Sequence, residues 1–323
     1  MICTLLGPPT LDDLLDSLVS QDWIAGDEII IVDNGMPKER RAQIEQRLEM
    51  FTPSSVSVQI YQEPQKGVVQ ARIKSIKVSR NPWLFSLDDD NFLEQKALSQ
   101  IRQRLAEYPA LGGICPRIEP CWEVKPERWV MALGHQVLSY NASELHEPPD
   151  DWHLWEPGVI GQRPPTGGMI ISKSVAEEFV RLCGKVPTIS RFTPSEGRRF
   201  TGEDFILYSL IYMRKDLFTA YDGEIIIRHQ IPQRRMTFSY LLKTMFWSNY
   251  CFGLQGLMRF GKTRFIYVLI RGLGRLLLEW IKQSSRIVSL RVLFGYAAGV
   301  AGFLFGAFVG MVSRDYGRIH IDP

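Results

Sequence analysis

Apolar and polar residues alternate along residues 1–115 in a pattern that predicts strands and helices in turn. The apolar run Ile2–Leu6 and the β-branched run Glu28–Val32 are typical of buried strands. Between them, a helix is indicated by leucines at helical spacing, namely Leu11, Leu14, Leu15 and Leu18. Further strands are predicted at 56–61 and 83–87, and further helices at 37–50, 68–78 and 94–108. Because the links are short, we predict an α/β fold with a mostly parallel sheet flanked by helices.

Residues 116–235 carry a less regular pattern. The stretch 116–165 holds four tryptophans and many prolines without a clear period, which predicts a long excursion over the sheet. The elements predicted after it are a Gly-rich strand at 166–171, a helix from Ser174, a polar loop at 190–202, an apolar helix at 205–213 and a last strand at 224–228.

From Met236 onward the pattern is helical and rich in Leu, Phe and Tyr. Residues 292–312 are 21 consecutive residues without a charge, long enough to cross the hydrocarbon core of a bilayer. Glycines spaced four apart, such as Gly302 and Gly306, favour close helix packing in lipid. Two interpretations stay open: a transmembrane or re-entrant segment, and a buried helical hairpin of a soluble domain.

The charge is distributed unevenly along the chain. Residues 1–227 hold 24 Lys and Arg against 32 Asp and Glu, whereas residues 228–291 hold 12 Lys and Arg against the single acid Glu279. Because the basic segment directly precedes the uncharged run, we predict anionic membrane lipid as its partner, and no nucleic acid. The excess of Arg and Lys before the run favours the cytoplasmic face of the membrane, with peripheral, single-pass or re-entrant attachment.

Several other classes of chemistry find no support in the sequence. The five cysteines are scattered, odd in number and without zinc-ligand spacing, so a reducing compartment is expected. We expect no signal peptide at the N-terminus. No Walker loop or G-x-G-x-x-G follows a predicted strand, and there is no G-x-S-x-G, so ATP, hydride and serine-hydrolase chemistry are not indicated.

The run Asp88-Asp89-Asp90 ends a predicted strand and is the strongest chemical signal in the chain. Adjacent carboxylates repel and raise one another's pKa unless a cation neutralises them. Mn²⁺ or Mg²⁺ suits such oxygen ligands and binds through one or two carboxylates together with substrate phosphates. Asp33 also follows a predicted strand, and ligands of parallel sheets bind at the carboxyl ends of strands. The alternative is a solvated acidic turn that caps the next helix.

An ordered set of short motifs resembles glycosyltransferase family 2, whose members have the GT-A fold. The motifs span roughly residues 1–240 and are Asp33-Asn34-Gly35, Lys66-Gly67-Val68-Val69-Gln70-Ala71-Arg72, Phe85-Ser86-Leu87-Asp88-Asp89-Asp90, Thr166-Gly167-Gly168, Gly202-Glu203-Asp204 and His229-Gln230-Ile231-Pro232. The resemblance implies a catalytic domain at 1–235, with the nucleotide-sugar side at 1–115 and the acceptor side at 116–235. A helical, membrane-associated region at 236–323 would follow, with a possible transmembrane segment at 292–312.

The resemblance also implies an activity and the residues that perform it. The expected reaction is metal-dependent transfer of a hexosyl or related group, with inversion, from a nucleotide-diphosphate sugar to a sugar or lipid-linked acceptor, in polysaccharide or glycolipid synthesis. Asp204 would be the catalytic base. Asp88, Asp90 and His229 would hold the divalent ion. The donor would be bound by Asp33, Lys66, Arg72, Asp88, Asp89 and Arg235.

Two other functions compete with this interpretation. One is a sugar-phosphate nucleotidyltransferase, although Gly7-Pro8-Pro9 followed by Asp12-Asp13 suits a triphosphate poorly. The other is a non-catalytic, membrane-tethered binding protein with a degenerate site. Met236 stands where processive polysaccharide synthases of the family carry Trp, which argues against a polymerase.

Overall fold

A computed structural model gives the structure of the chain. It describes residues 1–4, 7–51, 56–135, 137–141, 152–155, 167–186, 189, 203–260, 262–284 and 289–312. These fall into two compact units, which are described separately. The first contains Met1–Cys121, Ser139–Gly184 and Leu207–Gln230, and the second contains Trp122–Leu138, Lys185–Ile206 and Ile231–Pro323.

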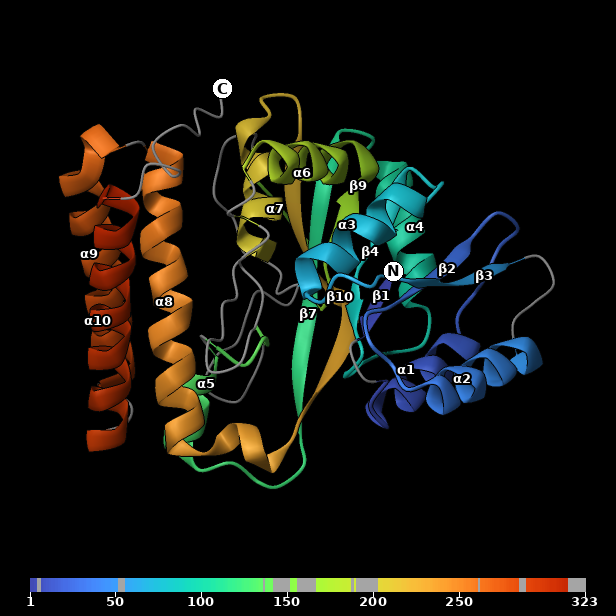
Figure 1. Cartoon of the computed structure of the whole chain (residues 1–323), viewed down its shortest axis with the longest axis horizontal. Coiled ribbons are helices and arrows are strands. Elements are labelled where there is room, and N and C mark those ends of the chain that lie inside the picture. The colour runs from blue at the N-terminus through green and yellow to red at the C-terminus, as the bar shows by residue number, and fades with distance from the viewer. Residues whose placement is uncertain are drawn as a thin grey trace. The chain divides into compact units, whose positions relative to one another are not determined.

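The first unit is built on a four-stranded parallel sheet, as the pattern of residues 1–115 predicts. Its strand order is β3-β2-β1-β5, formed by β1 (Ile2–Thr4), β2 (Glu28–Asp33), β3 (Ser57–Gln62) and β5 (Leu87–Asp88). The connecting helices are α1 (Thr10–Val19), α2 (Lys38–Phe51) and α3 (Val68–Val78). α1 and α2 lie on one side of the sheet and α3 on the other (Figure 1). The order in which strands are added therefore reverses at β1, and open parallel sheets bind ligands at such a point, beyond the carboxyl ends of the strands.

Apolar burial explains why these segments form a sheet and its cover. Leu11, Leu14, Leu15 and Leu18 lie on one face of α1 and are at most 3% exposed, and the Ile29–Val32 run of β2 is buried. Each fully buried side chain of this size contributes about 1.5–3 kcal/mol relative to an exposed one. Pro9 is the N-cap of α1, and Thr10 is its first helical residue.

The second sheet of this unit was not predicted as such. Its order is β4-β9-β7-β10-β6, with β8 paired to β10. The pairs β10–β6, β10–β8, β4–β9 and β7–β9 are antiparallel. Its strands are β4 (Trp83–Phe85), β6 (Asn91–Leu93), β7 (Leu111–Trp122), β8 (His153–Trp155), β9 (Ile170–Ser172) and β10 (Phe218–Ile231). The expectation of a mostly parallel sheet thus holds for the first sheet and fails for the second.

One predicted strand is divided between the two sheets. The segment 83–87 forms β4 in the antiparallel sheet and β5 in the parallel sheet, with Ser86 between them. This division delivers the acidic run to the junction of both sheets. Helices α4 (Ala97–Glu107), α6 (Lys173–Lys185) and α7 (Glu203–Met213) complete the described elements around them.

The second unit is helical. It contains α5 (Arg128–Gly134), the 3-10 turns η2 (Gln233–Met236) and η3 (Lys262–Arg264), and the long helices α8 (Phe238–Phe260), α9 (Phe265–Ser284) and α10 (Leu290–Val312). α10 packs on α8 through glycines, as the four-residue spacing predicts. A Cβ at Gly302 would lie 2.0 Å from the Phe246 carbonyl oxygen, and one at Gly306 would lie 2.0 Å from that of Tyr250. By length and composition α10 is apolar enough to cross a membrane, the only such helix among the described residues.

Some residues of the predicted elements and motifs lie outside the described residues. These are Leu5 and Leu6 near the N-terminus, Thr166, the polar loop 190–202 and Gly202. Of the predicted excursion 116–165, the structure describes the end of β7, α5 and β8. Trp152 stacks on Tyr108 at 4.8 Å between ring centroids, and Trp129 meets the Phe238 ring edge-on at 5.9 Å. Both tryptophans therefore pack on other side chains.

Candidate active site

Asp33 and Asp88 lie at the same edge of the parallel sheet, on the two strands that flank β1. The register pairs Thr4 of β1 with Asp33 and Cys3 with Asp88. Two interstrand spacings separate the flanking strands, which is roughly 10 Å. The carboxyl ends of the strands lie at this edge, beside β1, where the strand order reverses. Parallel sheets bind ligands at such an edge.

A short strand brings His229 to the acidic run. β6 begins at Asn91, directly after the run, and pairs with β10 so that His229 lies opposite Asn91. The Gln230 backbone N–H donates to the Asp90 carbonyl at 2.8 Å. The buried His229 places Nε2 3.4 Å from Asp90 Oδ2. This pairing joins residues that are 139 positions apart in sequence, and the predicted role of Asp90 and His229 as metal ligands stays a prediction.

The acidic run is electrostatically strained in the absence of a cation. Burial, then the charges of Asp90 and Asp89, raise the pKa of Asp88 from 3.8 to about 7, while Arg72 and His229 oppose the rise. Arg72 is 1% exposed and projects from α3. It therefore acts as an internal counter-charge beneath the run, and its predicted contact with the donor stays a prediction.

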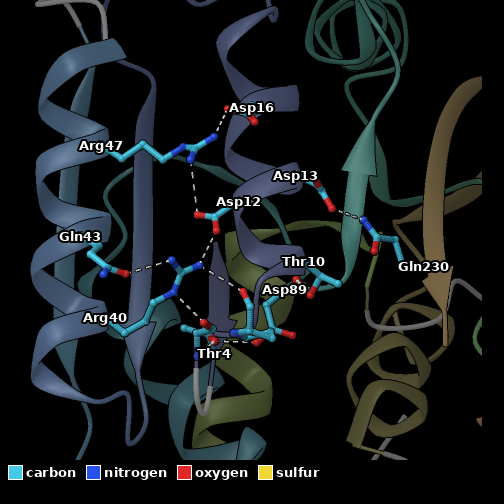
Figure 2. Close-up of polar contacts among 12 residues, drawn as sticks. Thr4, Thr10, Asp12, Asp13, Asp16, Arg40, Gln43, Arg47, Asp89 and Gln230 are labelled. Carbon is cyan, nitrogen blue, oxygen red and sulfur yellow. Dashed lines mark hydrogen bonds and ion pairs between the residues drawn. The ribbon is translucent and has the colours of Figure 1, made fainter. Parts of the chain in front are cut away.

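Asp89 points toward the loop that follows β1. Its Oδ2 accepts a hydrogen bond from the Thr4 hydroxyl at 2.5 Å, and its carbonyl accepts one from the Thr10 hydroxyl at 2.8 Å (Figure 2). The Asp89 carboxylate thus ties the acidic turn to the end of β1, and the Asp89 carbonyl ties it to the start of α1. Asp89 thus has a structural role in the turn, and its predicted role in donor binding stays a prediction.

Arg40 braces the same loop and was not singled out from the sequence. It reaches from α2 and donates to the carbonyls of Gly7 at 2.8 Å and Pro8 at 3.3 Å, and to the Asp12 carboxylate at 2.8 Å (Figure 2). Its position within a helix of many charged residues gives no periodic signal. Only the tertiary packing of α2 beside α1 reveals its role.

Asp33 and Asn34 shape the turn between β2 and α2. Asp33 is 2% exposed, and its Oδ1 accepts the backbone N–H groups of Gly35 at 2.9 Å and Met36 at 2.7 Å. Asn34 accepts from the Gly67 N–H at 2.6 Å and donates to the carbonyls of Glu63 and Gln65. Asn34 therefore holds the Asp33 turn against the loop that carries the exposed Lys66. Nucleotide binding by Asp33 and Lys66 stays a prediction.

Asn91 and Gly167 enclose Asp88. The Asn91 amide oxygen accepts the Asp88 backbone N–H at 2.9 Å. A Cβ at Gly167 would lie 2.3 Å from Asn91 Oδ1 and 2.6 Å from Asp88 Oδ2, closer than real Cβ contacts. Gly167 was quoted only as part of a motif, and its close approach to the carboxylate gives that motif a physical reason. Asn91, a polar residue at the start of a strand, was missed.

Replacing Gly167 by Ala is expected to displace the Asp88 carboxylate and lower kcat/KM for sugar transfer by about 100-fold. The measurement is steady-state release of nucleoside diphosphate, with circular dichroism to verify folding. Gly184→Ala is the matched control, because nothing lies within 4 Å of a Cβ at Gly184. Full activity in Gly167→Ala would show that the carboxylate tolerates the shift and would contradict the prediction.

The remaining predicted residues, Asp204 and Arg235, belong to the second unit. Asp204 is half-buried in the first turn of α7, and Arg235 is half-buried in η2, where its backbone N–H donates to the Pro232 carbonyl at 2.8 Å. The distances given above for the first unit therefore do not include Asp204 or Arg235. The base role of Asp204 and the diphosphate role of Arg235 stay predictions.

A second motif is excluded by its setting. The segment Gly256–Thr263 (GLMRFGKT) has the residue spacing of a phosphate-binding loop, but α8 continues through Phe260. A phosphate loop joins a strand to the N-terminus of a helix, where backbone N–H groups are open to phosphate. Here Gly256–Phe260 form the end of α8 and Lys262–Arg264 form η3, so the described residues of this segment lack that setting.

The donor set of the acidic run fits a divalent ion that is shared with substrate. No three His, Cys, Asp or Glu side chains in the described part of the chain are arranged to enclose a metal by themselves. Mg²⁺ and Mn²⁺ sites of nucleotide enzymes need only one or two carboxylates, because substrate phosphates supply further ligands. Asp88, Asp90 and His229 would hold the ion, where burial and the charges of Asp90 and Asp89 already raise the pKa of Asp88.

Mn²⁺ is expected to raise the melting temperature more at about pH 8 than at about pH 6. The folded-state pKa of Asp88 lies above its ordinary value, so its negative charge lowers stability increasingly as the pH rises from about 4 to about 7. A cation relieves this penalty only when the carboxylate is ionised, and below about pH 7 it must displace a proton. Differential scanning fluorimetry with and without Mn²⁺ measures the effect.

The variant Asp88→Asn supplies the control for this pH dependence. It should raise the melting temperature of the metal-free protein at about pH 8, and Mn²⁺ should then give a small shift that does not depend on pH. Equal Mn²⁺ shifts at both pH values in the unmodified protein would contradict the prediction.

Comparison with known proteins adds a family and a fold. The model of glycosyl transferase family 2 matches residues 1–160. A 1–349 fragment of S. aureus TarS in complex with UDP-GlcNAc has 12% sequence identity and a TM-score of 0.50, with 95% of this chain and 89% of that chain covered. A longer S. aureus TarS structure has 11% identity and a TM-score of 0.47, with 95% of this chain covered. Comparison with curated protein sequences gives no match.

The present chain spans 54% of that longer TarS chain. At 12% identity the likeness to the fragment shows a shared fold and nothing of substrate. The family match carries more, because residues 1–160 include both the Asp33 turn and the acidic run. The predicted GT-A type of α/β fold is confirmed, and residues 1–160 of the chain match the model of glycosyl transferase family 2.

Proposed function

We propose that the chain transfers a sugar from a nucleotide-diphosphate donor to an acceptor hydroxyl, with a divalent ion and with inversion. The observation that carries the proposal is the placement of Asp33 and Asp88 on both sides of β1, with Asp90 beside His229. A nucleoside bound near Asp33 would present its diphosphate to the acidic run across a span of roughly 10 Å.

The acidic run and the residues around it have separate roles in stabilising the leaving group. Asp88, Asp90 and His229 would hold the ion, which when bound would supply positive charge against the departing diphosphate. Asn91 and Gly167 fix the Asp88 carboxylate, and Asp89 fixes the turn through Thr4. Lys66, Arg72 and Arg235 add positive charge on the donor side.

The acceptor requires a base. Its hydroxyl oxygen forms a bond to the anomeric carbon while the bond from that carbon to the diphosphate oxygen breaks. The hydroxyl proton passes to the Asp204 carboxylate, and the nucleoside diphosphate leaves with the electron pair. A single displacement of this kind inverts the anomeric centre. The position of Asp204 at the start of α7, within the Glu203-Asp204 pair, supports this assignment through the family motif.

The acceptor class follows from the C-terminal region. α10 is apolar enough for membrane association, and the segment 228–291 is strongly basic. A lipid-linked or membrane-proximal acceptor at the cytoplasmic face suits these features and would place the reaction in cell-surface polysaccharide or glycolipid synthesis. The domain division at residue 235 is part of the same proposal.

A donor screen tests the proposed function. Full-length protein is incubated with nucleotide-diphosphate sugars in the presence of Mn²⁺, Mg²⁺ or EDTA, and the released nucleoside diphosphate is measured. UDP-GlcNAc is tested first, because a TarS fragment was crystallised with it. Metal-dependent release, even by slow hydrolysis without acceptor, is the expected result. Release of inorganic diphosphate from a nucleoside triphosphate and a sugar phosphate would identify a nucleotidyltransferase instead. Absence of donor binding to every nucleotide-sugar would indicate a non-catalytic binding protein.

A further inference from the structure

One side of α10 is apolar and exposed along the whole helix. Phe294, Leu304, Phe305, Phe308 and Val312 expose between 41% and 61% of their surfaces. The opposite side, which includes the glycines Gly302 and Gly306, packs on α8. Residues 292–312 contain no charge, so the exposed residues on this side of α10 beyond Arg291 offer water an apolar surface.

α9 carries a second exposed apolar stripe. Ile266, Ile270, Leu278 and Ile281 recur at helical spacing and are 71%, 69%, 61% and 51% exposed. The other side of α9 contributes Val268 and Leu276 to a small core that also includes Phe303 of α10. The two helices therefore pack against each other and each leaves an apolar stripe uncovered. We call the two stripes together the α9–α10 face.

The charges around this face are almost all positive. Glu279 is the only acid in residues 228–291, against 12 Lys and Arg. Arg271 lies among the exposed residues of α9 and donates to the Tyr267 hydroxyl at 2.9 Å. Tyr and Arg with apolar bodies and polar ends are typical of helices at a bilayer surface, and the excess of positive charge favours anionic headgroups.

Packing within the second unit argues against a bilayer span by α10. The backbones of α8 and α10 approach closely at Gly302 and Gly306, so α10 could cross a bilayer only together with α8. If they crossed a bilayer with α9, the charged residues Arg271, Glu279 and Lys243 would enter the hydrocarbon, which is strongly unfavourable. With the helix axes parallel to the bilayer surface, only the apolar stripes are buried, and the charged side chains remain near the headgroups.

We propose that the α9–α10 face docks in plane on an anionic lipid bilayer, without crossing it. The inference rests on the membrane partner of the proposed function but not on the transfer reaction. It names apolar side chains of both helices as the lipid contacts and excludes a span, whereas the sequence pattern leaves transmembrane, re-entrant and peripheral attachment of the C-terminal region open.

Vesicle flotation of the full-length protein tests the docking surface. Binding to vesicles of equal parts phosphatidylcholine and phosphatidylglycerol should exceed binding to pure phosphatidylcholine. The double substitution Ile270→Glu with Phe308→Glu should lower binding by about tenfold or more. Ile24→Glu is the matched control, because Ile24 is an apolar residue of the first unit that is 50% exposed. Unchanged vesicle binding in the double variant would overturn the proposal.

Labelling separates in-plane docking from a span. In a Cys121→Ser background, Leu290→Cys and Val312→Cys mark the two ends of α10. With protein bound to the outside of vesicles, a membrane-impermeant maleimide should label both ends to the same extent, because both would lie in the outer leaflet. Protection of one end would establish a span and overturn in-plane docking.

Light scattering without lipid measures the oligomeric state and so tests whether a second copy of the chain covers the α9–α10 face. A dimer that dissociates in the double variant, together with no vesicle binding by the unmodified protein, would show that this face joins two chains and would overturn the proposal. None of these measurements uses a sugar donor, so an inactive enzyme that still binds vesicles would contradict the proposed transfer reaction alone.

Discussion

Asp90→Asn is expected to lower kcat by about 100-fold to 1000-fold and to raise the Mn²⁺ concentration needed for half-maximal activity. Asp90 lies in the two-residue turn between β5 and β6, and its carboxylate is 3.4 Å from His229 Nε2. An amide of the same size keeps the shape but removes the negative charge that would bind the ion. The measurement is a Mn²⁺ titration of nucleoside diphosphate release.

The matched control for Asp90→Asn is Asp16→Asn. Asp16 also pairs with a basic residue, Arg47, but its side chain is 63% exposed and lies on α1 outside the acidic run. The control should keep the activity and the metal requirement of the unmodified protein. Metal-dependent activity at the normal level in Asp90→Asn would remove the acidic run from the reaction and with it the main support for the proposed function.

Asp204→Asn is expected to reduce transfer by about 100-fold to 10,000-fold while donor binding changes little. The amide cannot accept the proton of the acceptor hydroxyl, whereas the donor and the ion would be held by residues of the first unit. Calorimetric titration with nucleoside diphosphate and Mn²⁺ gives donor affinity, and product formation with a suitable acceptor gives the rate. Loss of both together would indicate that Asp204 supports folding or donor binding instead.

Asp216→Asn serves as the control for Asp204→Asn. Asp216 pairs with Arg214 near the C-terminal end of α7, and its side chain is 62% exposed. It tests whether a change of charge close to α7 alters the rate without contact with substrate. Equal rate losses in the two variants would point to α7 stability and not to proton transfer.

The first half of the parallel sheet could be predicted from local pattern because each element buries one continuous face. The helix predicted at 68–78 coincides with α3, and the strand predicted at 28–32 lies within β2. Periodicity also indicated the long C-terminal helices and their glycine contacts. In these segments the hydrophobic spacing of neighbouring residues is the main determinant of structure.

The second sheet could not be predicted in the same way. β4, β6 and β9 have three residues each, too few for a periodic signal, and their partners are far away in sequence. The break at Ser86, between a strand of one sheet and a strand of the other, has no local marker. Pairing between distant strands depends on the packing of the whole unit, which a short window does not contain.

The candidate site divides along the same line. The residue types were evident from the sequence, because adjacent carboxylates after a buried strand need a cation and an Asp-Asn-Gly turn follows a β-branched run. The tertiary structure alone decided that β6 lies beside β10, that His229 therefore meets Asp90, and that Gly167 lies against Asp88. Local chemistry is encoded by neighbours in the chain, whereas the distances that make a site depend on contacts between segments more than a hundred residues apart.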